Sequence, residues 1–154
     1  MVGRPAPPPD RSLVDPLAPL AMSALLDARI SARRPEAGTV LIADDDADMR
    51  LYLRGCLRIA GVGEILEAAD GREALRLARS ARPALIISDV LMPGLDGGAL
   101  CRALKADPQT RAIPFLLISG ETLAPPPCTD GFLPKPFNMA TLRAHVRPLL
   151  ERSS

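Results

Sequence analysis

Five side chains that could handle phosphate or a metal ion stand at or just after short apolar runs of this sequence. They are Asp44, Asp45, Asp89, Ser119 and Lys135. If the apolar runs form one open parallel sheet, their carboxyl ends converge on the crevice where such sheets bind ligands. Three carboxylates in a half-buried crevice would repel one another, so we expect a cation between them. Because all of these ligand atoms are oxygens, the sequence predicts magnesium rather than zinc.

The same residues could carry out a phosphoryl transfer. Asp89 is the candidate nucleophile, because a carboxylate can attack phosphorus and become an acyl phosphate. The negative charge of a transferring phosphoryl group would be neutralised by magnesium on one side and by the Lys135 ammonium on the other. Ser119 could donate a hydrogen bond to a phosphoryl oxygen, and Gly120 leaves room for the group to enter.

The elements that must position these residues can be predicted from the pattern that begins at Thr39. Apolar runs of strand length alternate with segments of helical period, which indicates a parallel sheet with crossover helices. Five strands are expected, over residues 39–43, 64–68, 84–88, 114–119 and 131–134. Asp70, Asp96 and Asn138 can cap the later helices at their amino ends. Pro148 should kink or fray the last turn of the final helix.

Composition narrows the class of protein. A chain of 154 residues with 47% hydrophobic content is long enough for one domain with a core, and a formal charge of +1 favours neither nucleic acid nor an anionic membrane. No apolar run approaches the roughly 20 residues that span a bilayer. Three widely spaced cysteines fit reduced thiols better than a disulfide framework. We therefore expect a cytoplasmic protein without a membrane or direct nucleic-acid partner.

Residues 1–37 differ from the rest of the chain. Four prolines among the first ten residues predict an extended or disordered tail. Beyond Pro19, a short amphipathic helix is expected, with one apolar side made of Met22, Leu25, Leu26 and Ile30. A helix this short is only marginally stable in isolation. We therefore expect either a loosely docked extension or a contact for a partner, which could be a second copy of the chain in a homodimer.

Four pieces of the sequence resemble, in their order and spacing, the receiver domains of response regulators in two-component systems, in particular single-domain regulators of the chemotaxis type. The pieces are residues 41–46 (LIADDD), 88–97 (SDVLMPGLDG), 118–120 (ISG) and 133–137 (LPKPF). This resemblance implies a receiver domain over residues 38–154. It also implies a flavodoxin-like, doubly wound, five-stranded parallel α/β sheet with strand order 2-1-3-4-5.

The resemblance further implies roles for particular residues. Asp89 would take a phosphoryl group from a histidine kinase or phosphotransferase protein. Mg²⁺ would be held by Asp44, Asp45, Asp89 and the backbone carbonyl of Leu91. Ser119 and Phe132 would form the switch that responds to phosphorylation, and the peptide between Lys135 and Pro136 would be cis. A protein of this kind is a phosphoacceptor with at most slow self-dephosphorylation, rather than an enzyme.

The sequence departs from the family pattern at residues 124–128 (APPPC). Three consecutive prolines cannot lie inside a helix. We therefore expect the family's fourth helix to be shortened or missing. Because that helix borders the surface on which phosphorylation is read, the switch and the usual dimer face could be altered here.

Two other functions remain open at this point. A pseudo-receiver would use the fold as an interaction module without phosphorylation. A magnesium phosphatase of the haloacid-dehalogenase type would use Asp44 as its nucleophile and Asp46 as its second carboxylate, but this hypothesis leaves Asp89 without a role. In the receiver reading no DNA-binding unit is expected after the last helix, so the output would be contact with a downstream protein.

Overall fold

The computed structural model describes residues 38–120 and 124–152 of the chain, and these form one α/β unit. Its strands are β1 (Thr39–Ala43), β2 (Glu64–Ala68), β3 (Leu85–Asp89), β4 (Phe115–Ser119) and β5 (Gly131–Pro134). Its helices are α3 (Ala47–Ile59), α4 (Gly71–Ala81), α5 (Gly97–Ala106) and α6 (Met139–Arg152). The extension predicted for residues 1–37, including its amphipathic helix, lies outside the described residues.

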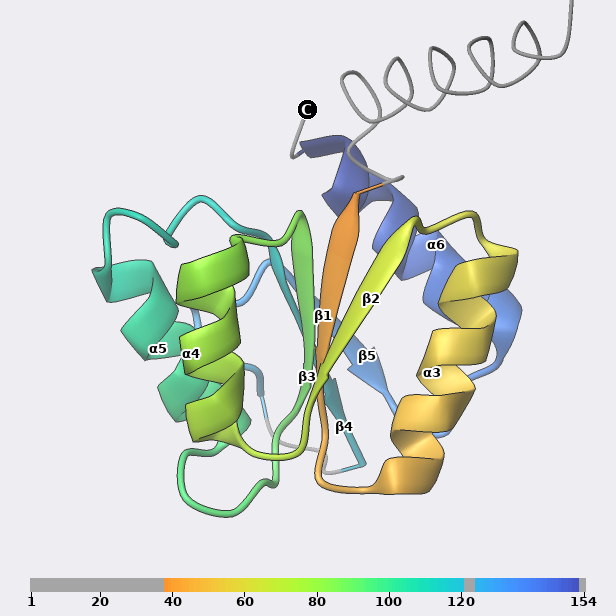
Figure 1. Cartoon of the computed structure of the whole chain (residues 1–154). Helices are drawn as coiled ribbons and strands as arrows, with labels where there is room; N and C mark the ends of the chain where they lie inside the picture. The colour runs from red at the N-terminus through yellow and green to blue at the C-terminus, as the bar shows by residue number, and fades with distance from the viewer. Residues whose placement is uncertain (1–37, 121–123, 153–154) are drawn as a thin grey trace, which may run out of the picture. The chain divides into compact units, whose positions relative to one another are not determined.

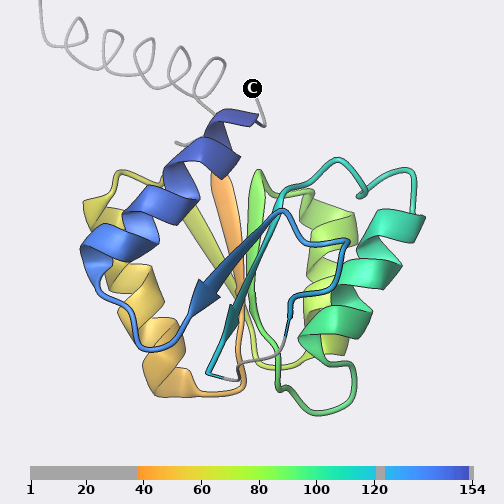
Figure 2. The same cartoon turned by 180° about the vertical axis from the view of Figure 1, so that it is seen from behind.

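The five strands are all parallel and have the order β2-β1-β3-β4-β5. Helices α3 and α6 cover one face of the sheet, and α4 and α5 cover the other (Figure 1). The view from behind shows α6 running alongside β5 and the same pairing of helices on each face (Figure 2). The structure therefore confirms the flavodoxin-like fold and the strand order that the sequence predicted.

Successive side chains of a strand enter two different cores because they point to opposite faces of the sheet. On β1, Val40 and Ile42 pack with Leu53 under α3 and α6, whereas Leu41 packs with Leu100 under α4 and α5. All five of these side chains are buried. The continuous apolar runs of the central strands are explained by this double coverage.

Side-chain caps begin each described helix. The carboxylates of Asp46, Asp70 and Asp96 accept hydrogen bonds from backbone amides in the first turns of α3, α4 and α5, and Asn138 does the same for α6. Such caps satisfy amides that have no partner within the helix. The predicted caps Asp70, Asp96 and Asn138 are thereby confirmed. Helix α6 continues through Pro148 to Arg152, so the proline does not end it.

The connection from β4 to β5 contains no helix in its described part, residues 124–130. Instead, Pro126 packs close to the first turn of α5, where its Cγ lies 3.5 Å from the position that a β-carbon on Gly98 would take. A turn follows, in which the Thr129 hydroxyl donates to the Pro126 carbonyl at 2.8 Å. The prediction of a shortened or missing fourth helix is consistent with these residues.

An ionic network joins three elements at the amino ends of β4 and β5. The Asp130 carboxylate pairs with Lys105 of α5 at 2.9 Å and with Arg152 of α6 at 3.2 Å. It also accepts a hydrogen bond from the backbone amide of Phe115 at 2.8 Å. Burial by itself would raise the pKa of Asp130, but these donors and charges outweigh it and hold the pKa below its usual value.

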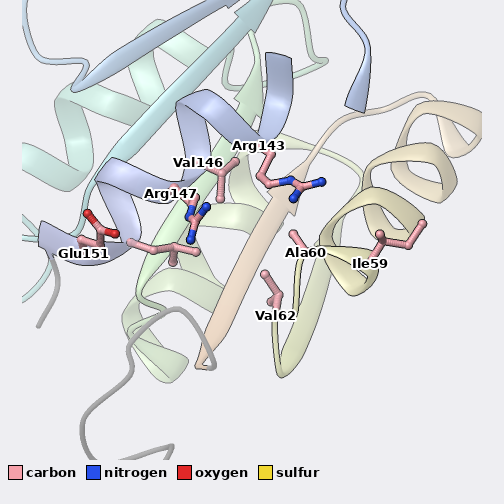
Figure 3. Close-up of a pocket in the computed structure, with 8 residues that line it drawn as sticks. Ile59, Ala60, Val62, Arg143, Val146, Arg147 and Glu151 are labelled. Atoms are coloured by element: carbon pink, nitrogen blue, oxygen red, sulfur yellow. The ribbon is translucent and has the colours of Figure 1, made fainter. Parts of the chain in front are cut away.

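Away from the carboxyl ends of the strands, a cavity of about 490 Å³ opens between the last turn of α3 and the part of α6 from Arg143 onward. Ile59 and Val62 lie on one side of it, with Arg143, Val146 and Arg147 on the other (Figure 3). None of the helices among the described residues could serve as a membrane span.

Candidate functional site

Three carboxylates come together at the carboxyl ends of β1 and β3, the lower edge of the sheet in Figure 1. Each of Asp44, Asp45 and Asp89 offers one oxygen atom, and these oxygens all lie within 4.8 Å of one another. Asp44 is buried, Asp89 is half-buried and Asp45 is exposed. The cluster therefore reaches from the interior of the sheet to its surface.

Lys135 brings a positive charge to the same edge. Its ammonium nitrogen lies 3.1 Å from the Oδ1 atom of Asp89. Its amide donates to the Ser119 carbonyl at 2.8 Å, which ties the lysine to the end of β4. The Lys135–Pro136 peptide is cis, as the resemblance implied. The ammonium thus stands next to one of the three carboxylates.

The charge of Asp44 is unfavourable in this environment. The pKa of Asp44 is raised to about 6, mainly by burial and further by the neighbouring carboxylates of Asp89 and Asp45. A hydrogen bond from the Asp46 amide and the charge of Lys135 only partly offset these effects. A divalent cation among the three oxygens would favour the ionised form of each carboxylate.

The donor set suits a hard cation. Closely spaced carboxylate oxygens, of which those of Asp45 and Asp89 are accessible to water, are ligands that Mg²⁺ takes together with water molecules and a substrate phosphate. Leu91, whose carbonyl the sequence analysis assigned as a further ligand, lies two residues after Asp89 in the loop that leads to α5, and its side chain is exposed. That role stays a prediction.

Ser119 and Phe132, the expected switch residues, line a common cavity of about 190 Å³ beside the acidic cluster. Ser119 ends β4 and is buried, and Phe132 lies on β5 and is half-buried against the core under α4 and α5. Pro125 and Pro126 line the same cavity. The proline segment, residues 124–128, therefore borders the place where the family's switch would operate.

Two residues beside the site were not singled out as functional by the sequence analysis. Gly97 begins α5 directly against the backbone carbonyl of Asp89, and Arg50 of α3 donates to the backbone carbonyl of Asp44 at 2.6 Å. For the first contact, the sequence signals were two glycines at a helix start, where they weaken the helix, and the position of Gly97 at the end of the motif at residues 88–97. For Arg50 there was none, since the contact depends on how α3 is oriented toward β1.

An open parallel sheet with an acidic cluster and a lysine at its carboxyl edge has the architecture of a receiver domain. The chain belongs to the response regulator receiver domain family, whose model matches residues 40–147.

Known proteins similar to this chain agree with that assignment. The response regulator MprA of Mycolicibacterium vanbaalenii is 39% identical over 119 residues, which cover 75% of this chain and 51% of the relative. The chain thus spans about half the length of that relative.

Solved structures show the same fold. The receiver domain of a signal transduction histidine kinase from Syntrophus aciditrophicus is 40% identical, with a TM-score of 0.67 over 74% of this chain and 90% of that domain. The receiver domain of sensor histidine kinase PA1611 from Pseudomonas aeruginosa, which has a magnesium ion coordinated in its active site cleft, is 26% identical. Its TM-score is 0.65, over 75% of this chain and 96% of that one.

Proposed function

We propose that this chain is a working phosphoacceptor receiver, in which Asp89 takes a phosphoryl group from a histidine kinase or a phosphotransferase protein. The observation that carries the proposal is the 3.1 Å ion pair between Lys135 and Asp89 beside two further carboxylates. A bare acidic patch would be a weak indication of function. A carboxylate that lies in a candidate cation site and also faces an ammonium is arranged to receive a dianionic group.

The transfer can be written from the residues of the chain. An Asp89 carboxylate oxygen attacks the phosphorus of a phosphohistidine, a P–O bond forms, and the P–N bond breaks with its electron pair returning to the imidazole. Asp89 becomes an acyl phosphate. The Lys135 ammonium, which pairs with Asp89 beforehand, then faces a phosphoryl oxygen and balances part of its charge. The Ser119 hydroxyl would donate to another phosphoryl oxygen.

Magnesium is the cofactor that we propose for this site, held by Asp44, Asp45, Asp89 and the carbonyl of Leu91. When bound, it would neutralise part of the negative charge of the phosphoryl group, in addition to the Lys135 ammonium. Asp44 would orient it from the interior and Asp45 from the surface. The magnesium coordinated in the PA1611 receiver domain supports this assignment.

The output of the phosphorylated state would be contact with a downstream protein in the cytoplasm, without catalytic turnover of a small-molecule substrate. Ser119 and Phe132 would change position on phosphorylation, and the cavity that they share with Pro125 and Pro126 gives them one common environment. In relatives that have the fourth helix, this helix borders the surface that downstream proteins contact. In this chain we expect the proline segment to occupy that place.

The test is to locate the covalent adduct. The protein is incubated with Mg²⁺ and acetyl phosphate, and the modified peptide is identified by mass spectrometry after borohydride trapping of the acyl phosphate. We expect modification at Asp89, and none in Asp89→Asn. Asp46→Asn is the matched control, because Asn also caps a helix and the receiver reading gives Asp46 no part in transfer.

The other outcomes separate the rival functions. An adduct on Asp44 that is lost in Asp46→Asn would support the phosphatase hypothesis. The absence of any adduct, with partner binding unchanged in Asp89→Asn, would identify a pseudo-receiver. In the structure, neither alternative explains why Lys135 pairs with Asp89.

A further inference from the structure

Arg50 connects three elements next to the acidic cluster. It stands in the first turn of α3, and one of its terminal guanidinium nitrogens donates to the Asp44 carbonyl at 2.6 Å. Its Nε atom lies 3.1 Å from Oε1 of Glu67, which belongs to β2. The Arg50 side chain is only 19% exposed, so both contacts are made largely out of water.

The contact with Asp44 bears directly on where its carboxylate points. The Asp44 amide donates to the Ala68 carbonyl at 3.0 Å, and its Oδ1 atom accepts from the Asp46 amide at 2.9 Å. The second bond ties the carboxylate to the backbone two residues further along. If the peptide group that contains the Asp44 carbonyl tilted, the Asp44 carboxylate would therefore move relative to Asp89.

We propose that Arg50 is a positioning residue of the magnesium site, acting through the Asp44 carbonyl. Arg50 has only donors and a positive charge, so it cannot be a metal ligand itself. Its guanidinium fork can hold two acceptors at fixed angles, which are here the Asp44 carbonyl and the Glu67 carboxylate. This inference rests on the proposed function, because it presupposes that the three carboxylates bind Mg²⁺.

Arg54 supplies a matched control within the same helix. It lies one turn after Arg50, and its Nε atom is 3.1 Å from Oε2 of the same Glu67 carboxylate. Its side chain is 40% exposed. Arg54→Ala therefore removes an arginine ion pair with Glu67 and leaves the bond between Arg50 and Asp44 in place.

The experiment titrates Mg²⁺ into the metal-free chain by isothermal calorimetry, in the wild type, Arg50→Ala, Arg50→Lys and Arg54→Ala. Removing the partner of a metal ligand typically lowers metal affinity by about 10-fold to 100-fold. We expect Arg50→Ala to bind Mg²⁺ about 10-fold more weakly and Arg54→Ala to stay within about twofold of the wild type. Urea unfolding of each variant in EDTA measures the purely structural effect, which we expect to be larger for Arg50→Ala, because Arg50 is less exposed than Arg54 and also bonds the Asp44 carbonyl.

The lysine variant keeps the charge but cannot hold both acceptors in a planar fork. We expect it to fold and to bind Mg²⁺ at least about threefold more weakly, so it decides the question if Arg50→Ala does not fold. Equal Mg²⁺ affinity in the wild type and both Arg50 variants would overturn the inference and leave the proposed function standing. Absence of Mg²⁺ binding by the wild type would instead overturn the proposed function.

Discussion

Gly97 lies directly against the backbone carbonyl oxygen of Asp89, so closely that a β-carbon on Gly97 would overlap that oxygen. The Gly97 amide also donates to the Val90 carbonyl at 2.8 Å. The first residue of α5 is thus in direct contact with the backbone of the candidate phosphoacceptor. The Asp89 carbonyl and the Leu117 side chain leave no space for a side chain at position 97, although alanine is ordinarily the better helix residue.

Gly97→Ala is expected to destabilise the domain by about 1–3 kcal/mol, the usual range for overpacking a well-packed site. Because backbone atoms are in the way, the strain should move Asp89 and weaken Mg²⁺ binding as well. Urea unfolding and magnesium calorimetry measure the two effects.

Gly98→Ala is the control for this substitution. Its β-carbon would meet only ordinary contacts, at 3.5 Å from Arg102, Asp96 and Pro126. With no overlap, replacing a helical glycine should be neutral or stabilise by up to about 1 kcal/mol. If the two alanine variants were equally stable, the close approach to Asp89 would not be real.

Asp44→Asn is expected to stabilise the metal-free domain and to abolish its response to magnesium. The substitution removes a buried charge that two neighbouring carboxylates oppose, and the asparagine oxygen can still accept from the Asp46 amide. We expect a gain of about 1 kcal/mol in the free energy of unfolding in EDTA, at the low end of what a shifted carboxylate contributes. Calorimetric unfolding with and without Mg²⁺ is the measurement.

In the wild type, saturating Mg²⁺ should raise stability by about 2.7 kcal/mol at a concentration 100 times the dissociation constant. The Asp44→Asn variant should show no such rise. Asp46→Asn, which changes an exposed carboxylate at a helix cap, should respond to Mg²⁺ as the wild type does. An unchanged magnesium response in Asp44→Asn would remove Asp44 from the proposed ligands.

The elements that carry the site could be predicted because their signals are local. Apolar runs marked the strands, Asp70, Asp96 and Asn138 marked helix starts, and the parallel topology indicated that Asp44 and Asp89 would meet at one edge. The consecutive prolines excluded a regular fourth helix.

The contacts between distant residues could not be predicted in this way. The bond from Arg50 to the Asp44 carbonyl depends on the rotation of α3, and the pair of Lys105 and Asp130 joins positions 25 residues apart. Gly97 ends the motif at residues 88–97, but the sequence does not show that it packs against the Asp89 carbonyl. Each of these contacts depends on how the helices and strands pack against one another, and only a three-dimensional structure shows that packing.

Asp130→Asn is expected to lower stability at neutral pH and to flatten the acid limb of the stability curve. The pKa of Asp130 is lower in the folded chain than its usual value of 3.8, mainly because Lys105 and the Phe115 amide outweigh the effect of burial. A carboxylate with a lowered pKa stabilises the fold at pH values above its unfolded pKa. That contribution is lost as the pH falls through the folded pKa, so the wild type should lose it below about pH 4.

Unfolding in urea between pH 3 and pH 7 tests this prediction. At pH 7, Asp130→Asn should destabilise by about 1–3 kcal/mol, since a half-buried Lys105 loses its charged partner. Arg79→Ala, which breaks an exposed pair with Asp107, should change stability by less than about 1 kcal/mol and leave the pH dependence alone. If the free energy of unfolding of Asp130→Asn fell with decreasing pH as steeply as that of the wild type, the prediction would be contradicted.

Pro126 and Pro127 offer a direct measure of how firmly the proline segment is packed. The two prolines are adjacent, but Pro126 is half-buried against the first turn of α5, whereas Pro127 is exposed. Replacing either with alanine makes the unfolded chain more flexible by a similar amount, and this costs about 0.4–1 kcal/mol. Pro126→Ala should lose about 1 kcal/mol more than Pro127→Ala, because it also gives up ring contacts that close the cavity around Ser119 and Phe132. Equal urea midpoints for the two variants would show that the proline segment does not pack on α5. A shared cavity could then not connect the proline segment with Ser119 and Phe132.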